Sequence, residues 1–187
     1  RVGQFCFCRD VTIERTFEHQ IWISANTDAL TGLYNRRFFY EYMNENRKEN
    51  QLSLLYVDLD DFKKVNDAHG HHIGDGALEL VARLMREAFP GDFIVRLGGD
   101  EFLICLVGER SLAFLEEKAN RLLQSLLGAF QASDYLRVMS ASIGIASSAD
   151  PGTKLDDLVR QSDIAMYAAK QSGKSRCCVY SSGLTKK

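Results

Sequence analysis

The sequence predicts an α/β domain built as a three-layer sandwich, with a central mixed β-sheet of about five strands and helices on both faces. Three observations support this fold class. Apolar runs rich in strand-forming residues alternate with segments whose apolar residues recur at helical spacing. The run 52–57 is almost continuously apolar, which is typical of a central strand buried on both faces. The runs 93–95 and 102–106 flank Gly98-Gly99 and predict a β-hairpin, because paired glycines supply the positive φ angles of tight turns.

The N-terminal residues predict elements that belong to a larger protein. Residues 1–12 alternate apolar and polar positions and indicate one strand, which cannot be stable alone. We therefore expect residues 1–12 to be the terminal strand of an upstream domain and residues 13–27 to be a linker helix. Trp22 and Ile23 on the flank of this helix leave two alternatives open, contact with a partner helix or with the helix's own domain.

The main domain is expected over residues 28–180, and residues 181–187 are expected to form a disordered tail. The elements predicted within it are, in chain order, a helix capped near Asn35, the central strand 52–58, a polar loop 66–75, a helix 74–89 stopped by Pro90-Gly91, the hairpin, a helix capped by Ser111, a strand 136–145, a helix 155–170 ended by Gly173 and a strand 176–180.

Composition narrows the class of protein. The chain has 187 residues, 45% of them hydrophobic, and a formal net charge of −2. This near-neutral balance argues against a nucleic-acid polymer as partner, since no basic excess exists to release counterions. No apolar run approaches the roughly 20 residues that a membrane helix needs, so no membrane contact is expected from these residues. The five cysteines lie mostly in apolar runs, which favours buried thiols in a reducing cytoplasm.

Two acidic segments lie at the ends of predicted strands. Asp100 and Glu101 begin the returning strand of the hairpin, and Asp58, Asp60 and Asp61 follow the central strand. A solvated acidic turn is the simpler interpretation of the hairpin taken alone. If sheet pairing brings the two segments together, they form a carboxylate cluster whose hard oxygen ligands suit Mg²⁺. Such a cluster serves metal-assisted phosphoryl or nucleotidyl transfer.

Polar residues elsewhere fit a guanine nucleotide. Asp75 can accept both N–H donors of the guanine pairing edge while the Asn66 amide donates to O6. The alternative for Asp75 is a carboxylate stabilised by the dipole of its own helix. Lys170 and Lys174, together with Lys63, can form a phosphate clamp, although the first two also suit the C-terminal end of a helix.

Five motifs in this order closely resemble the GGDEF family of diguanylate cyclases, which join two GTP into cyclic di-GMP and release two pyrophosphates. The motifs are Asp-Ala-Leu-Thr-Gly-Leu-Tyr-Asn-Arg-Arg at 28–37, Asp-Leu-Asp-Asp-Phe-Lys-Lys-Val-Asn-Asp at 58–67, Gly-His-His-Ile-Gly-Asp at 70–75, Arg-Leu-Gly-Gly-Asp-Glu-Phe at 96–102 and Ser-Asp-Ile-Ala-Met-Tyr-Ala-Ala-Lys at 162–170. The resemblance covers residues 27–180. It implies the fold shared by nucleotidyl cyclases and polymerase palm domains, with the 96–102 motif on the hairpin.

The resemblance also implies roles for individual residues. Asp58, Asp100 and the backbone carbonyl of Leu59 would bind Mg²⁺, with Mn²⁺ as an alternative, and Glu101 would assist the metal site or activate the 3′-hydroxyl. Guanine would be read by Asn66 and Asp75, with Leu30, Phe62 and Leu78 around the base. The phosphates would be held by Lys63, which we also count as catalytic, by Lys170 and Lys174, and by backbone amides near Asp61.

Three features bear on regulation. Lys174 stands where the family usually has Arg, which keeps the charge but loses the bidentate fork. Phe89 replaces the Arg of the family's Arg-x-x-Asp product-inhibition motif while Asp92 is retained, so this inhibitory site is expected to be degenerate. Residues 3–21 also resemble the last strand and exit helix of a PAS-type sensor domain.

The expected function is a diguanylate cyclase that acts as a cytoplasmic homodimer, with one GTP per subunit, as the C-terminal output domain of a signalling protein. Two alternatives are a GTP-binding module without turnover and another nucleotidyl transferase on a palm-like scaffold. The intact Asp100-Glu101 pair argues against the first. The guanine-reading pair Asn66 and Asp75 argues against the second.

Overall fold

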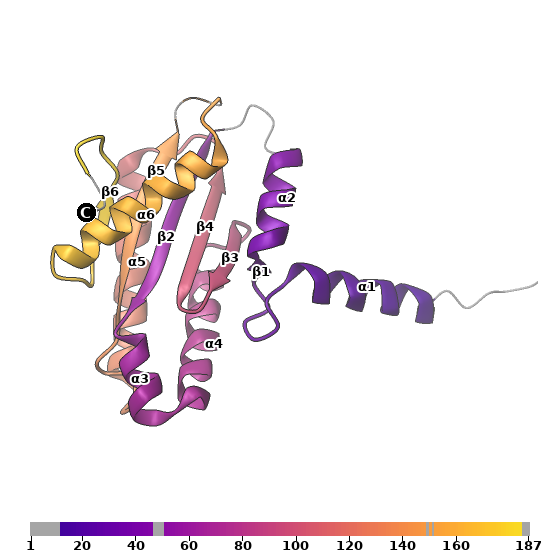
Figure 1. The fold of residues 1–187 in the computed structure, drawn as a ribbon, viewed down its shortest axis with the longest axis horizontal. Helices are drawn as coiled ribbons and strands as arrows, with labels where there is room; N and C mark the ends of the chain where they lie inside the picture. Colours follow the sequence, from indigo (N-terminus) through magenta and orange to yellow (C-terminus); the bar gives the residue numbers. More distant parts are fainter. Residues whose placement is uncertain (1–11, 47–50, 149, 151, 185–187) are drawn as a thin grey trace, which may run out of the picture.

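The chain forms a six-stranded mixed sheet in this computed structural model, which describes residues 12–46, 51–148, 150 and 152–184 (Figure 1). The elements are α1 (Thr12–Asn26), β1 (Tyr34–Asn35), α2 (Arg36–Asn46), β2 (Leu52–Asp60), α3 (Phe62–His69), α4 (His71–Ala88), β3 (Phe93–Gly98), β4 (Glu101–Val107), α5 (Leu112–Gln131), β5 (Ser140–Ser148), α6 (Leu155–Gln171) and β6 (Cys177–Val179). The strand order is β1-β3-β4-β2-β5-β6, with β2 antiparallel to both neighbours and the two edge strands parallel to theirs. The predicted fold class is confirmed.

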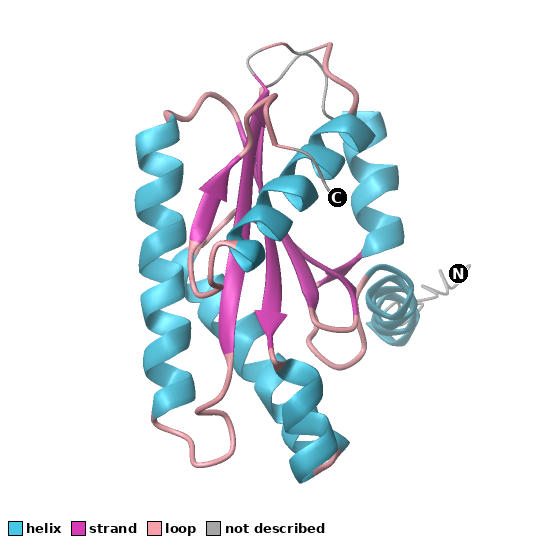
Figure 2. Ribbon diagram, turned by 60° about the vertical axis from the view of Figure 1, so that its left-hand side comes forward, coloured by secondary structure: helices cyan, strands magenta, loops and turns pink. Residues whose placement is uncertain are grey.

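The central strand β2 is buried along its whole length, as its apolar run predicts. Leu55, Val57 and Leu59 face a core shared with α3, α4 and α5. Leu54 and Tyr56 face a second core shared with α2 and α6. Figure 2 shows the sheet between these two layers of helices. Because successive side chains of a strand point to opposite faces, one strand supplies both cores.

Side-chain caps fix the predicted beginnings of two helices. Asn35 Oδ1 accepts from the Phe38 amide at 2.9 Å at the start of α2. Ser111 Oγ accepts from the Phe114 amide at 3.2 Å at the start of α5. Each cap satisfies an amide that has no partner within its helix, which explains why both starts were readable from the sequence.

Two predicted elements were wrong, and one short strand was not predicted. The loop expected over 66–75 is helical except at Gly70, whose φ of 84° makes the sharp turn between α3 and α4. The polar residues of this segment led to the loop prediction, but they lie on the solvent side of a helix whose inner face is Phe62 and Val65. The strand expected over 136–145 is displaced to Ser140–Ser148, and the short edge strand Tyr34–Asn35 was not expected.

Helix α1 projects from the body of the domain (Figure 1). It is attached at its C-terminal end, where Asn35 and Arg37 donate to the Ala25 carbonyl at 2.9 and 2.6 Å. Trp22 packs edge-on against Phe38, with ring centroids 5.4 Å apart, so this side chain contacts its own domain. Phe17 and Ile21 are 60% and 68% exposed.

Some expectations fall at the limits of the described residues. The strand predicted at the N-terminus lies outside them, apart from Thr12, which begins α1. The described part of the predicted tail, 181–184, forms a turn closed by a hydrogen bond from the Leu184 amide to the Ser181 carbonyl. Among the helices described, none is both long and apolar enough to cross a membrane.

Candidate functional site

The two acidic segments meet at one end of the sheet, as the sequence predicts. In the antiparallel pairing of β2 with β4, Asp58 lies opposite Glu101. The Leu59 amide donates to the Asp100 carbonyl at 3.3 Å, which continues the pairing one residue beyond the first residue of β4, Glu101. The strand end and the tip of the hairpin therefore form one acidic cluster.

Burial and neighbouring charge perturb Asp58. Its side chain is 9% exposed, and burial raises its pKa to about 6, with a further rise from the Asp100 and Glu101 carboxylates. The Lys170 ammonium opposes this rise from α6. Lys170 Nζ lies 2.5 Å from Asp58 Oδ1 as an ion pair. In the described part of the chain, Oδ1 has no hydrogen-bond donor apart from this ammonium.

The acidic cluster fits a hard divalent cation. Burial of a carboxylate is costly unless a cation neutralises its charge. The Lys170 ammonium supplies one such cation to Asp58, whose neighbours Asp100 and Glu101 are also carboxylates. The other predicted ligands, Asp100 and the Leu59 backbone, are adjacent through the hydrogen bond between them. Carboxylate and carbonyl oxygens of this kind are the ligands that Mg²⁺ prefers.

Tyr56 is a member of this cluster that the sequence analysis missed. It lies two residues before Asp58 on the same face of β2 and is 7% exposed. Burial raises the pKa of the Tyr56 hydroxyl, and the nearby Glu101 carboxylate raises it further. The period of two along a strand was the available signal, since it places Tyr56 and Asp58 side by side.

Of the residues expected to surround a guanine base, Asn66 and Phe62 on α3 lie against Gly74 on α4. Phe62 and Leu78 are buried in one core cluster, and Leu30 packs against the same cluster. Asn66 Oδ1 is the second buried side-chain oxygen that finds no hydrogen-bond partner in the described part. Asp75 is exposed on α4, next to Gly74. This region therefore combines apolar side chains with a buried amide oxygen that has no hydrogen-bond donor among the described residues.

The predicted phosphate lysines reach the site from different elements. Lys174 Nζ donates to Asp61 Oδ2 at 2.9 Å, and Lys64, which the sequence analysis did not single out, contacts Asp61 Oδ1 at 2.9 Å. These hydrogen bonds, first that of Lys64, hold the pKa of Asp61 below its usual value. Lys63 is exposed at the start of α3, where the first amides of a helix have no intrahelical partner.

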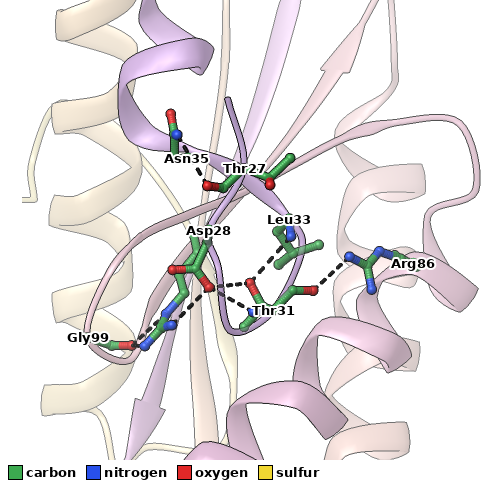
Figure 3. A network of polar contacts seen from close by, with 8 residues as sticks. Thr27, Asp28, Thr31, Leu33, Asn35, Arg86 and Gly99 are labelled. Carbon is green, nitrogen blue, oxygen red and sulfur yellow. Dashed lines mark hydrogen bonds and ion pairs between the residues drawn. The ribbon is translucent and has the colours of Figure 1, made fainter. Parts of the chain in front are cut away.

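A polar network ties the hairpin to the turn after α1 (Figure 3). Asp28 Oδ1 accepts from the Thr31 amide and hydroxyl at 2.8 and 2.7 Å, and from Arg96 Nη1 at 3.0 Å. Arg96 also donates through Nε and Nη2 to the Gly99 carbonyl at 3.0 and 2.8 Å. Arg86 on α4 donates to the Thr31 carbonyl at 2.8 Å. The motifs at 28–37 and 96–102 are therefore in direct contact.

Phe89, at the position expected to carry an inhibitory Arg, is buried in the core at 1% exposure. Burial raises the pKa of Asp92, while Arg110 and Lys118 oppose the rise. The sequence analysis missed these two cations because they come from beyond the hairpin. Lys118 Nζ already donates to the Ala88 carbonyl at 2.8 Å and lies 5.2 Å from the centroid of the Phe89 ring.

The fold and the acidic cluster define an α/β domain with carboxylates gathered at one end of its sheet. Residues 25–176 match the family described as diguanylate cyclase, GGDEF domain, and the chain belongs to this family. Its structure superposes on that of the coiled coil and GGDEF domain of DgcB from Caulobacter crescentus in complex with c-di-GMP. The TM-score is 0.79, at 28% identity, over 90% of this chain and 94% of that one.

Relatives of the chain carry different activities in their names. It is 37% identical to cyclic di-GMP phosphodiesterase PdeR of Escherichia coli (strain K12) and 31% identical to a diguanylate cyclase of Vibrio cholerae serotype O1. These matches cover 94% and 96% of this chain. They span only 27% and 57% of the two relatives.

Proposed function

We propose that this domain is a diguanylate cyclase, which condenses two GTP into cyclic di-GMP and releases two pyrophosphates. The observation that carries the proposal is the Asp58 carboxylate, buried opposite Glu101 with one oxygen held by the Lys170 ammonium alone. The cyclases of this family use divalent metals. Mg²⁺ bound to Asp58, Asp100 and the Leu59 carbonyl would supply positive charge to the triphosphate and lower the pKa of the attacking hydroxyl.

The protein side chains would bind and orient the nucleotide. Asn66 and Asp75 would pair with the guanine edge, between the apolar side chains of Leu30, Phe62 and Leu78. Lys63 and Lys174 would bind the phosphates, together with the backbone amides near Asp61. Lys170 would leave Asp58 for a phosphate oxygen, because a bound cation competes for the same carboxylate. The ion pair between Lys170 and Asp58 would thus be replaced by two interactions, one between the bound cation and Asp58 and one between Lys170 and a phosphate oxygen.

The reaction would need two subunits. The 3′-oxygen of one GTP forms a bond to the α-phosphorus of the other, and the bond to the pyrophosphate breaks. A second transfer of the same kind closes the ring. Glu101 would assist the metal site or the activation of the 3′-hydroxyl. Each subunit holds one nucleotide in this scheme, so a homodimer of facing sites is part of the proposal.

The domain would work inside a larger cytoplasmic signalling protein. GGDEF domains act in multidomain signalling proteins, and the described contacts of α1 with the domain include Trp22 with Phe38 and the Ala25 carbonyl with Asn35 and Arg37. We place the catalytic domain at 28–180 and the linker helix at 13–27. The likeness of residues 3–21 to a PAS-type exit segment supports a sensor domain upstream.

A second candidate function is a GTP-binding module without turnover. It is favoured by the similarity to PdeR, which is named a phosphodiesterase. The intact Asp100-Glu101 pair of this chain favours the cyclase instead.

The experiment that tests the proposal is incubation with GTP and Mg²⁺, with pyrophosphate measured and the nucleotide product identified by chromatography. The rate per subunit is expected to rise with protein concentration, because the active unit is a dimer. Calorimetric binding of GTP without pyrophosphate release would identify the binding module. A linear dinucleotide or 3′,5′-cyclic GMP as product would identify another nucleotidyl transferase.

A further inference from the structure

Asp60 is a buried carboxylate that the proposed mechanism does not use. It lies two residues after Asp58 and is 1% exposed. Its Oδ2 accepts from Ser140 Oγ at 2.7 Å, and both of its oxygens accept from Ser142 Oγ at 2.9 and 3.0 Å. The Ser175 amide also points to Oδ2, at 3.3 Å. Asp60 therefore joins the end of β2, the start of β5 and the loop that follows α6.

That loop has an unusual backbone. Lys174 and Ser175 have φ angles of 59° and 50°, so two consecutive residues with side chains adopt the left-handed conformation. This conformation is unfavourable for residues other than glycine and persists only where the surroundings hold it. Two hydrogen bonds hold it here, from the Lys174 amide to the Ala169 carbonyl at 3.1 Å and from the Ser175 amide to Asp60.

The same loop delivers Lys174 to the site. Its ammonium contacts Asp61 Oδ2 at 2.9 Å, so the neighbours Asp60 and Asp61 hold the loop through one backbone amide and one side chain. The Asp61 hydrogen bond raises the pKa of Lys174, and the Asp60 and Asp58 charges add to the rise. Exchange of the Asp61 contact for a phosphate would leave the loop held by its two amide bonds, to Ala169 and to Asp60, of which the bond to Asp60 connects it to β2.

We propose that Asp60 is a positioning residue, which holds the left-handed Lys174–Ser175 turn so that the Lys174 ammonium faces the phosphates of the nucleotide. This inference rests on the proposed function, because it assigns Lys174 to phosphate binding. A carboxylate suits the position, since its two oxygens can accept from two hydroxyls and an amide together. An amide side chain has only one accepting oxygen and would present N–H groups to the same donors.

The test is a double-mutant cycle on nucleotide affinity. The ligand is a GTP analogue with a methylene bridge between its α- and β-phosphorus atoms, titrated calorimetrically with Mg²⁺. Asp60→Asn and Lys174→Ala are each expected to raise the Kd about tenfold, the effect of one lost hydrogen bond to a charged group. The double variant is expected to bind as weakly as Lys174→Ala alone, because both changes act through one contact. Ser175→Gly is expected to recover part of the affinity of Asp60→Asn, since glycine adopts the turn without strain.

Asp157→Asn is the matched control. It removes the same charge from a carboxylate on α6 that pairs only at the surface with Arg160, at 3.4 Å, and the Kd is expected to stay unchanged. A wild-type Kd in folded Asp60→Asn, or a double variant whose Kd rises by the product of the two single effects, would overturn the inference.

Asp60→Ser serves as a second variant. If both Asp60 variants fail to fold where Ser142→Ala folds, the carboxylate supports the fold itself and the positioning role is rejected. If the wild-type protein does not bind the analogue, the proposed function fails instead.

Discussion

Gly74 on α4 lies directly against Asn66 on α3, so that a Cβ at position 74 would stand 1.9 Å from Asn66 Oδ1 and 3.2 Å from the Phe62 ring. No side chain larger than hydrogen fits there unless Asn66 moves. Under the proposed function, Asn66 reads the guanine edge, so glycine at position 74 is a condition of base recognition.

The first prediction is that Gly74→Ala lowers the affinity for GTP about tenfold or more, because a displaced Asn66 amide no longer pairs with the base. The ratio of the GTP affinity to the ATP affinity is expected to fall for the same reason. Gly76→Ala is the matched control on the same helix, since a Cβ there meets nothing within 4 Å. It is expected to leave the affinity intact and to stabilise the helix by about 0.5–1 kcal/mol. Calorimetric titration of GTP and of ATP measures the two affinities. An unchanged preference for GTP in Gly74→Ala would show that Asn66 does not recognise the base.

The second prediction concerns the acidic cluster. Asp100→Ala is expected to lower turnover by at least about 10²–10³, the usual effect of losing one electrostatic stabiliser. Asp58→Ala is expected to abolish the rise in melting temperature that Mg²⁺ and GTP together produce, because the cation loses a buried carboxylate ligand. Turnover by pyrophosphate release and melting curves measure these two outcomes separately. Asp134→Ala, an exposed carboxylate paired with Arg137, is the control. Near-normal turnover in Asp100→Ala contradicts the assignment.

The third prediction concerns Asp28 and pH. Burial raises the pKa of Asp28, but the Thr31 and Arg96 hydrogen bonds outweigh it and hold the pKa below its usual value. A depressed folded-state pKa stabilises the protein above the unfolded-state value of about 3.9, and the contribution disappears as the pH falls through the folded-state value. Asp28→Asn is therefore expected to lower the free energy of unfolding by about 1–2 kcal/mol at pH 7, and the difference from wild type is expected to shrink below about pH 4.

Urea unfolding across pH measures this difference. Asp134→Asn, whose side chain is 83% exposed and pairs with Arg137, serves as the matched control and is expected to change stability little at any pH. An Asp28→Asn difference that stays constant from pH 7 to about pH 3 would show that the carboxylate charge is not what stabilises the turn.

The fourth prediction concerns product binding at the Phe89–Asp92 turn. Cyclic di-GMP is expected to show no saturable binding there at the concentrations the enzyme produces, because Phe89 is buried and Lys118 already donates to the Ala88 carbonyl. Titration into the wild type and into Asp92→Ala tests this. Tight binding that vanishes in Asp92→Ala would show a working site built from Arg110 and Lys118. Phe89→Arg does not serve as a restoring variant, because it would place an unpaired charge in the core.

The local sequence was enough to predict the elements whose causes are local. The continuous apolar run of β2 and the caps at Asn35 and Ser111 depend on neighbouring residues, and all three were predicted. The meeting of Asp58 with the hairpin acids was also predictable, because sheet pairing brings strand ends together. The α3 helix was not predicted, because its inner face has only two buried residues and the polar residues of its outer face are also typical of a loop.

The sequence by itself determined which chemical groups are present and that the two acidic segments share one end of the sheet. Only the tertiary structure decided which partners each of these acidic side chains has. Asp58 and Asp60 are both acidic and both on one face of β2, yet one meets Lys170 and the other meets two serines and an amide. The partners come from β5, α6 and the loop after it, 80 or more residues away in the chain. Long-range packing fixes these distances, and no local pattern of residues specifies them.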